Sequence, residues 1–282
     1  MTHNPTLLLI AQELGQQKLL NEISFKASGA FKETFRATTV DDNYIALKIL
    51  NPSKCDLARN NREVEAMTKC DSDYIGKLYD FGDFTASDGN KYLYMLEEFF
   101  DGGTLSEKLT NPFTPEIVRE YAIYLANALA HLKELNLVHR DIKPDNIMFR
   151  ENHDIPILVD FGLVRDLSSS SLTQTWLPQG PGTPYFAAPE QLNNEKYQIG
   201  WRTDQFSLGI VLGFCLTLKH PFAQEGMTMP ETVSAVAQRQ KCTQDFREKV
   251  IDLGFENIIK MLEPWAVHRF STPTDLLKSF ER

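Results

Sequence analysis

The stretch "LVHRDIKPDNIMF", residues 137–149, decides the fold together with "ILVDFGLVRD", residues 157–166. Each segment is a short polar loop between apolar runs that are typical of strands. The loops carry two carboxylates, an amide and an amine, from Asp141, Lys143, Asn146 and Asp160. Mg²⁺ prefers oxygen ligands and commonly takes one or two carboxylates together with substrate phosphates. "HRD" or "DFG" alone would be ordinary turn chemistry, so it is their combination that predicts a metal–phosphate site.

The region before these loops has the pattern of a small antiparallel sheet. Strands are predicted within 21–50, where "ISF", "ETFRATTV" and "YIALKIL" are rich in β-branched and aromatic residues and are separated by turn residues. A polar helix is predicted at 55–70, followed by strands in 75–85 and 91–100 that the turn "ASDGN" joins. The sheet therefore occupies the first third of the chain.

A further helix is predicted before the sheet, with Asn4 as its cap and Pro5 at its first position. Four apolar residues share one face of this helix: Leu7, Ile10, Ala11 and Leu14. We expect this face to pack on the domain that follows. The alternative is a docking helix for a partner.

Beyond the linker "DGGT", residues 101–104, the hydrophobic period changes from 2 to 3.6. A helix capped by Thr114 is predicted over 114–136, and 203–218 is apolar on nearly all sides, which is typical of a buried helix. The apolar stripe of the first helix consists of Ile117, Tyr121, Leu125, Ala128 and Leu132. A strand-rich part joined to a helical part predicts an α+β fold with two lobes and a ligand cleft between them.

The charge balance and the cysteines limit the partners and the location. The 282-residue chain has 29 basic and 38 acidic residues and a net charge of −9, so its surface as a whole repels nucleic acids and anionic membranes. Its four cysteines form no C-x-x-C pair, which argues against zinc and disulfides and favours a reducing cytoplasm. The N-terminus lacks the basic region of a signal peptide, and the apolar run 206–218 is too short to span a bilayer. We therefore expect a soluble, cytoplasmic protein with no nucleic-acid or membrane partner.

Seven motifs in order give the chain a specific resemblance to the eukaryotic-type (Hanks-type) serine/threonine protein kinase family, from about residue 22 to the C-terminus. They are "IALK", "REVEAM", "HRDIKPDN", "DFG", "GTPYFAAPE", "TDQFSLG" and the late arginine of "VHRF". The resemblance implies a bilobal protein kinase-like fold, with a small β-rich N-lobe containing one main helix and a larger, mostly helical C-lobe. The implied parts are an N-terminal helical extension at 1–20, the N-lobe at 21–98, a hinge at 99–103 and the C-lobe at 104–282.

The resemblance also implies the reaction, in which the γ-phosphate of ATP is transferred to serine or threonine hydroxyls of protein substrates, with Mg²⁺ or Mn²⁺ as cofactor. Lys48 would pair with the α- and β-phosphates and with Glu63, which orients it. Asp141 would accept the proton of the substrate hydroxyl, and Lys143 would neutralise the γ-phosphate in transit. The metal ligands would be Asn146 and Asp160. The other nucleotide-binding residues would be Gly29 in the phosphate loop, Ala46 and Met148 around the adenine, and Glu98 at the hinge.

A regulatory role is implied for the segment between Asp160 and Thr183. Arg140 is similar to the arginine that pairs with a phosphorylated activation segment, and a phosphate can order a loop by such a pair. The expected acceptors, which autophosphorylation would modify, are Thr173 or Thr175 first and the serine run ending at Ser171 second. The alternative is a merely solvated loop. The hydroxyl of Thr183 would hydrogen-bond the aspartate and lysine of the catalytic loop, which is typical of serine/threonine kinases.

Structural roles are implied for three charged residues of the helical part. Glu190 and Arg269 would form a buried ion pair, and Asp204 would hold the main chain of the loop around Asp141. We assign His139 only a packing role.

The phosphate loop departs from the pattern of the family, because Ala27 and Lys32 stand where it has glycines. Forcing a residue with a Cβ to positive φ costs roughly 1–2 kcal/mol, which would weaken ATP binding about ten-fold. Lys32 would place its ammonium either near the phosphates or in solvent. The residue at the back of the adenine pocket is either Glu97 or, with one inserted residue, Leu96.

These departures leave two alternatives to an active kinase. The first is a pseudokinase that acts as a regulatory scaffold with weakened nucleotide binding, and the second is another nucleotide-dependent transferase on the same fold. Regulation would come through the activation segment, the N-terminal helix, or a regulatory partner or homodimer.

Overall fold

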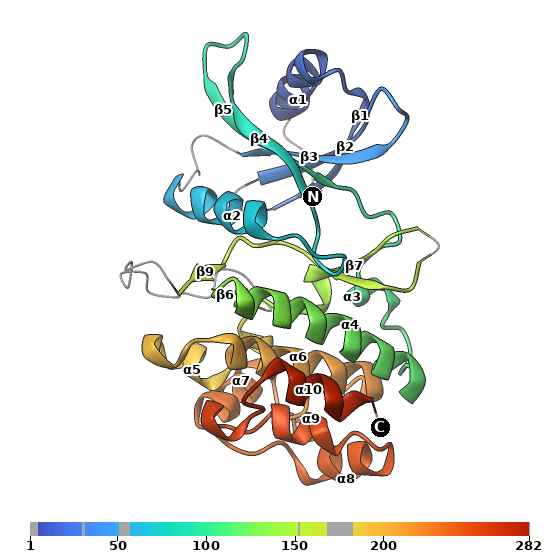
Figure 1. Ribbon diagram of the computed structural model, residues 1–282, viewed down its shortest axis with the longest axis vertical. Coiled ribbons are helices and arrows are strands. Elements are labelled where there is room, and N and C mark those ends of the chain that lie inside the picture. Colours follow the sequence, from blue (N-terminus) through green and yellow to red (C-terminus); the bar gives the residue numbers. More distant parts are fainter. Residues whose placement is uncertain (1–4, 30–31, 51–56, 152, 168–182, 282) are drawn as a thin grey trace. The chain divides into compact units, whose positions relative to one another are not determined.

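The structure is a computed structural model that describes residues 5–29, 32–50, 57–151, 153–167 and 183–281. Contacts divide the chain into two compact units, whose elements are labelled in Figure 1. The first unit comprises Met1–Asp71 and Gly76–Asp101, and the second comprises Ser72–Ile75 and Gly102–Arg282. The boundary between Asp101 and Gly102 falls within the stretch that the sequence marks as a linker.

The first unit is built on a five-stranded antiparallel sheet in the order β1-β2-β3-β5-β4. Its strands are β1 (Asn21–Ser28), β2 (Lys32–Thr38), β3 (Tyr44–Leu50), β4 (Leu78–Thr85) and β5 (Lys91–Glu98). Two helices accompany the sheet, α1 (Pro5–Lys18) and α2 (Leu57–Lys69). The period-two pattern thus predicted the strands correctly, and the α+β class is confirmed.

Alternation along the strands gives this sheet two different faces. One face carries Phe35, Leu47 and Leu96, which form a buried core with the apolar side of α1. That side consists of Leu7, Ile10, Ala11 and Leu14, each at most 4% exposed, as the helical periodicity predicts. The docking alternative for α1 is not supported, because its apolar face is already buried. The opposite face of the sheet carries Ala46 and Lys48, which alternate with Leu47 along β3.

The second unit is mostly helical and is organised around the buried helix α6 (Trp201–Thr217). Helix α6 packs against α4 (Pro115–Glu134), α8 (Gln244–Asp252) and α9 (Glu256–Met261). The described part of this unit also contains α3 (Leu105–Lys108), α5 (Pro189–Leu192), α7 (Met229–Ala237) and α10 (Pro273–Phe280). Two short antiparallel ladders pair β6 (Leu137–Val138) with β9 (Arg165–Asp166) and β7 (Ile147–Phe149) with β8 (Pro156–Leu158). Among the described residues, no helix has both the length and the apolar character needed to cross a membrane.

One core position predicted for α4 is wrong. Ile117 is 38% exposed, whereas Val118 is fully buried. At 3.6 residues per turn, a spacing of four residues drifts around the axis, so a stripe counted in fours leaves the buried side within one or two turns. The helix begins after Thr114 with Pro115 at its first position, but the Thr114 side chain makes no capping hydrogen bond.

Candidate active site

The first unit contains two ion pairs that involve residues singled out from the sequence. Lys48 Nζ lies 2.5 Å from Glu97 Oε2, and Lys32 Nζ lies 2.5 Å from Glu63 Oε1 of α2. The predicted pairing of Lys48 with Glu63 is therefore not the one that the structure contains. The reason is the register, because Glu97 stands opposite Ala46 and is thus a diagonal neighbour of Lys48, within reach of a long side chain.

The structure also distinguishes Glu97 from Leu96. Leu96 belongs to the apolar core beside α1. Glu97 is only 6% exposed and lies on the face that carries Lys48. Since successive side chains of a strand point to opposite faces, only one of these two residues can face Lys48. Glu97, the residue that the ungapped count gives, is thus the one that shares a face with Lys48, and its place at the back of an adenine pocket stays a prediction.

The expected strain of the phosphate loop is absent at the described positions. Neither Ala27 nor Lys32 is among the residues with positive φ, and both lie in strands, where Ala27 stands opposite Thr34. Gly29 also lacks a positive φ; its amide donates to the carbonyl of Lys32 at 2.8 Å, and an added Cβ would lie 3.2 Å from that oxygen. The positive φ angles from which a ten-fold loss of ATP affinity was expected are therefore not found at Ala27 or Lys32, and the affinity itself stays a prediction. Residues 30 and 31 lie outside the described part.

In the second unit, three predicted residues meet at the carboxylate of Asp141. Its Oδ2 accepts hydrogen bonds from Lys143 Nζ at 2.8 Å and from Asn146 Nδ2 at 3.0 Å. Asn146 ends the 3₁₀ turn η2 (Pro144–Asn146), and its Nδ2 also donates to the main-chain carbonyl of Asp141 at 2.8 Å. Burial raises the pKa of Asp141, and nearby Asp160 raises it further, while Lys143 and Asn146 oppose this shift. The carboxylate is thus prepared to take up a proton more readily than an exposed aspartate.

Asp160 follows β8 and is the second carboxylate of this site. Its Oδ1 accepts a hydrogen bond from the amide of Gly162 at 3.2 Å, and its charge acts on Asp141. Two carboxylates and an amide in one place fit a magnesium ion, because the ion would relieve the repulsion between the carboxylates. Within the described residues, no group of three or more His, Cys, Asp or Glu side chains could hold a metal ion alone. Further oxygen ligands, such as substrate phosphates, would therefore be needed.

The loop around Asp141 is held in a strained conformation by residues of α6 and α5. Arg140 has φ 70° and Asp160 has φ 65°, which is unfavourable for residues with a Cβ. The Asp204 carboxylate accepts from the amides of His139 at 2.7 Å and Arg140 at 2.8 Å. Gln191 donates to the carbonyl of Arg140 at 2.9 Å. Desolvation raises the pKa of Asp204 to about 7, although these amides oppose the shift.

His139 does more than the packing role assigned to it from sequence. Its ring packs edge-on against Phe161 at 4.9 Å between centroids. Its Nε2 donates to the carbonyl of Val159 at 3.1 Å, and its Nδ1 accepts from the amide of Asp141 at 3.3 Å. The imidazole therefore links the loops of Asp141 and Asp160, and burial lowers its pKa to about 4. The sequence offered little signal for His139 or Gln191 beyond their position in motifs.

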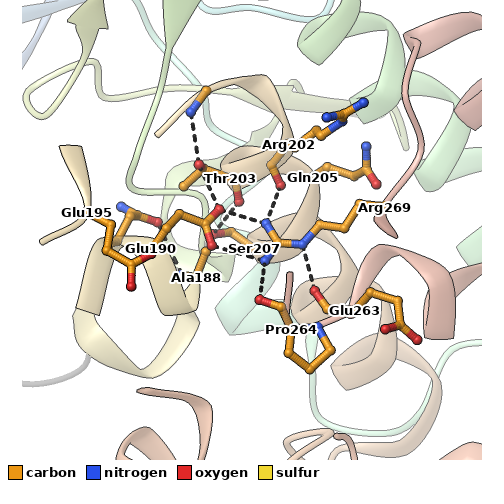
Figure 2. Close-up of polar contacts among 12 residues, drawn as sticks. Ala188, Glu190, Glu195, Arg202, Thr203, Gln205, Ser207, Glu263, Pro264 and Arg269 are labelled. Carbon is orange, nitrogen blue, oxygen red and sulfur yellow. Dashed lines mark hydrogen bonds and ion pairs between the residues drawn. The ribbon is translucent and has the colours of Figure 1, made fainter. Parts of the chain in front are cut away.

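Figure 2 shows the ion pair of Glu190 and Arg269, which are both fully buried. The guanidinium makes two bonds to the carboxylate, Nη1 to Oε1 at 2.7 Å and Nη2 to Oε2 at 3.0 Å. Its other donors bind the carbonyls of Glu263, Arg202 and Pro264 (Figure 2). Thr203 donates to Glu190 at 2.9 Å. The pair thus joins α5, α6 and the segment before α10, which is a structural role.

The remaining predicted residues are only partly described. Thr173, Thr175 and Ser171 lie outside the described residues, and Thr183 begins the 3₁₀ turn η3 (Thr183–Phe186). Ala46 is buried in the first unit, whereas Met148 lies in β7 of the second unit. Glu98 ends β5, and its Oε2 accepts from the amide of Lys77 at 3.4 Å. The assigned roles of these residues stay predictions.

A buried histidine near η3 gives the second unit a testable pH dependence. His220 Nε2 donates to the carbonyl of Tyr185 at 2.7 Å, and its Nδ1 accepts from the amide of Phe222 at 3.3 Å. Burial lowers the pKa of His220 to about 4. In the unfolded chain the pKa is about 6.5, so the stabilisation is complete above pH 6.5 and is lost as pH falls toward 4.

We therefore expect the stability of the protein to fall by about 3 kcal/mol relative to His220→Gln between pH 7 and pH 4. Comparing the two proteins cancels the contributions of His139, which acts in the same direction, and Asp204, which acts in the opposite one. Urea unfolding at several pH values measures this difference. The exposed His268→Gln is the control, and an equal pH dependence in wild type and His220→Gln would contradict the prediction.

Comparison with known proteins adds independent evidence. The model of the protein kinase domain matches residues 27–278. A probable serine/threonine-protein kinase of Streptomyces coelicolor is 33% identical over 187 residues, which are 63% of this chain and 27% of that protein. Serine/threonine-protein kinase PknD of Mycobacterium tuberculosis is 30% identical over 229 residues, 77% of this chain and 32% of that protein. Human Nek5 is 30% identical over 219 residues, 74% of this chain and 29% of that protein. The matched segment thus covers less than a third of each of these relatives.

Proposed function

The chain belongs to the protein kinase family, and from this premise we propose that it transfers the γ-phosphate of ATP to serine and threonine hydroxyls of protein substrates. The observation that carries the proposal is the cluster around Asp141, where Lys143 and Asn146 both bind the carboxylate within 3.0 Å. Phosphate transfer asks mainly for positioning and neutralisation of charge, and this cluster provides a base, a cation and a polar anchor.

In this proposal Asp141 accepts the proton of the substrate hydroxyl, and its raised pKa makes it a better acceptor. Lys143 neutralises charge on the phosphate, and Lys48 binds the phosphates of ATP. Mg²⁺, or Mn²⁺ in its place, would be held by Asn146 and Asp160 and would neutralise phosphate charge. Ala46, Met148, Gly29 and Glu98 would contact the rest of the nucleotide, as the family resemblance implies.

Serine/threonine specificity is supported by Lys143, two residues after Asp141, and by the names of the relatives. We further propose regulation by autophosphorylation at Thr173, Thr175 or Ser171, with Arg140 as the partner of the phosphate. We also propose that a regulatory partner or a homodimer contributes to the regulation of the activity. A cytoplasmic location is supported by Cys70, Cys215 and Cys242, which are free thiols.

Incubation with γ-labelled ATP, Mg²⁺ and casein, followed by phosphoamino-acid analysis, tests the specificity. We expect phosphoserine and phosphothreonine on casein, and phosphosites within 168–183 on the protein itself. Asp160→Asn should abolish both, because it removes one of the two acidic groups of the site. Label on tyrosine alone, or full labelling by Asp160→Asn, would contradict the proposal.

One observation favours a second function, that of a regulatory scaffold. Lys48 is bound to Glu97 rather than to the helix carboxylate Glu63, so the pair implied by the family is absent. A scaffold would keep its biological function after Asp141→Ala, whereas a kinase would lose it. The two functions are therefore separable by complementation of a deletion strain with this variant.

A further inference from the structure

Two lysines and two glutamates form a band across one face of the sheet in the first unit. Lys32 of β2 binds Glu63 of α2, and Lys48 of β3 binds Glu97 of β5, each with nitrogen and oxygen 2.5 Å apart. We call these four residues the charge band. Lys32, Lys48 and Glu97 lie on the face opposite the α1 core, because their strand positions alternate with the core residues of β2, β3 and β5. Glu63 contacts Lys32 on this face from α2.

The strand register explains why the partners are divided in this way. Lys48 of β3 has Thr34 of β2 opposite it on one side and Met95 of β5 opposite it on the other. Lys32 and Glu97 are each two residues from these positions, so both are diagonal neighbours of Lys48. A lysine at position 32 thus places a second cationic side chain on the same face as Lys48, one diagonal step away on the neighbouring strand. Since like charges on neighbouring strands repel, a separate carboxylate for each ammonium stabilises this arrangement.

All four side chains of the two ion pairs are largely buried, which distinguishes these pairs from exposed surface pairs. The side chains of Glu63 and Glu97 are 2% and 8% exposed, and those of Lys32 and Lys48 are 18% and 14% exposed. Carboxylates that are removed from water in this way need a cation. Glu97 Oε1 is moreover buried without a hydrogen-bond partner among the described residues, which is unfavourable for stability alone. The contact that the structure shows for this carboxylate is its ion pair with Lys48.

We propose that this chain directs two lysines toward the phosphates of its nucleotide: Lys32, positioned by Glu63, and Lys48, positioned by Glu97. The proposal deepens the proposed kinase function and rests on it for the identity of the nucleotide. Lys32 is then a second phosphate-binding residue, and Glu97 is a positioning residue that takes over the part expected of Glu63. The two lysines and two glutamates of the charge band balance each other in formal charge, so the band alone has no net charge.

The test is nucleotide affinity, measured by calorimetry at constant Mg²⁺ for ADP and for adenosine. Lys32→Met and Lys48→Met are each expected to weaken ADP about ten-fold, because each removes a charge-assisted hydrogen bond. Adenosine has no phosphate, so its affinity should change less than about two-fold. Adenosine binding also shows that each variant is folded. Lys69→Met is the control, because Lys69 pairs with Glu65 on the exposed side of α2.

Double-mutant cycles then identify the partners. Glu63→Gln should weaken ADP in the presence of Lys32 and have little further effect in Lys32→Met. Glu97→Gln should likewise have little further effect in Lys48→Met. Effects of Glu63→Gln and Lys48→Met should be additive. Two results would overturn the inference: an unchanged ADP affinity in Lys32→Met, or coupling of Glu63 with Lys48 and not with Lys32.

This measurement separates the inference from the proposed function, because ADP binding requires no phosphate transfer. If ADP binds with the expected pattern but no phosphate is transferred to protein, the kinase function fails and the two-lysine site stands. If transfer occurs while Lys32→Met and Glu97→Gln behave as wild type, the kinase function stands and the inference fails.

Discussion

Replacing Asp141 by asparagine is expected to lower the rate of phosphate transfer by about 10²–10⁴-fold, the usual contribution of a general base. Asparagine has nearly the same shape and can still contact Lys143 and Asn146, which bind the aspartate at 2.8 and 3.0 Å. It cannot accept the proton of the substrate hydroxyl. The affinity for ATP should therefore change little, and the loss should appear in kcat.

Steady-state assays with a serine or threonine peptide measure this effect. In wild type, kcat/KM should fall as the pH drops through the pKa of Asp141, and burial places this fall at a higher pH than for an exposed aspartate. The variant should lack this acid limb. Asp145→Asn is a matched control, because Asp145 lies in the same loop but is exposed. A kcat for Asp141→Asn within a factor of ten of wild type would contradict the role of the carboxylate.

Replacing Arg269 by methionine is expected to destabilise the protein by about 3–5 kcal/mol, the loss found when one partner of a buried pair is removed. The change leaves the Glu190 carboxylate fully buried without its cation. It also removes the donors to the carbonyls of Glu263, Arg202 and Pro264 (Figure 2). These groups would be desolvated without a partner, which is the main cause of the loss.

Urea unfolding of wild type, Arg269→Met, Glu190→Gln and the double variant measures the pair. The double variant should lose clearly less than the sum of the single variants, because it removes both charges. Lys91→Met is the control, since the Lys91–Asp83 pair is exposed and should contribute at most about 1 kcal/mol. A loss below about 1 kcal/mol for Arg269→Met would show that the pair is not a main support of the second unit.

The elements of the fold were predictable from local pattern, but the partners of charged residues were not. The face of α1 and the strands β1 to β5 follow from spacing, because the core selects apolar residues at fixed periods. Ile117 was misplaced because a spacing of four residues drifts around the helix axis, so the first residue of the stripe lies off the buried side. The partner of Lys48 depends on the register of β3 against β5, which no local pattern gives.

In the candidate site, too, local sequence pattern predicted some contacts and missed those that depend on distant residues. The sequence predicted which polar residues gather at Asp141, because the motif places Lys143 and Asn146 in one short loop. It did not predict that His139 Nε2 donates to the carbonyl of Val159, because this residue is 20 positions away in the sequence. The strain expected at Ala27 and Lys32 was inferred from glycines of the family, whereas this chain forms ordinary strands there.

The central claim, transfer of the γ-phosphate to protein, is tested most directly by parallel reactions with ATP labelled at the α- or at the γ-phosphate. We expect the γ-label to appear on protein while an equimolar amount of ADP is formed, and the α-label to stay in the nucleotide. Label from the α-phosphate on protein would identify a nucleotidyl transferase. Measurable nucleotide binding without any transfer to protein would contradict the kinase account and identify a scaffold.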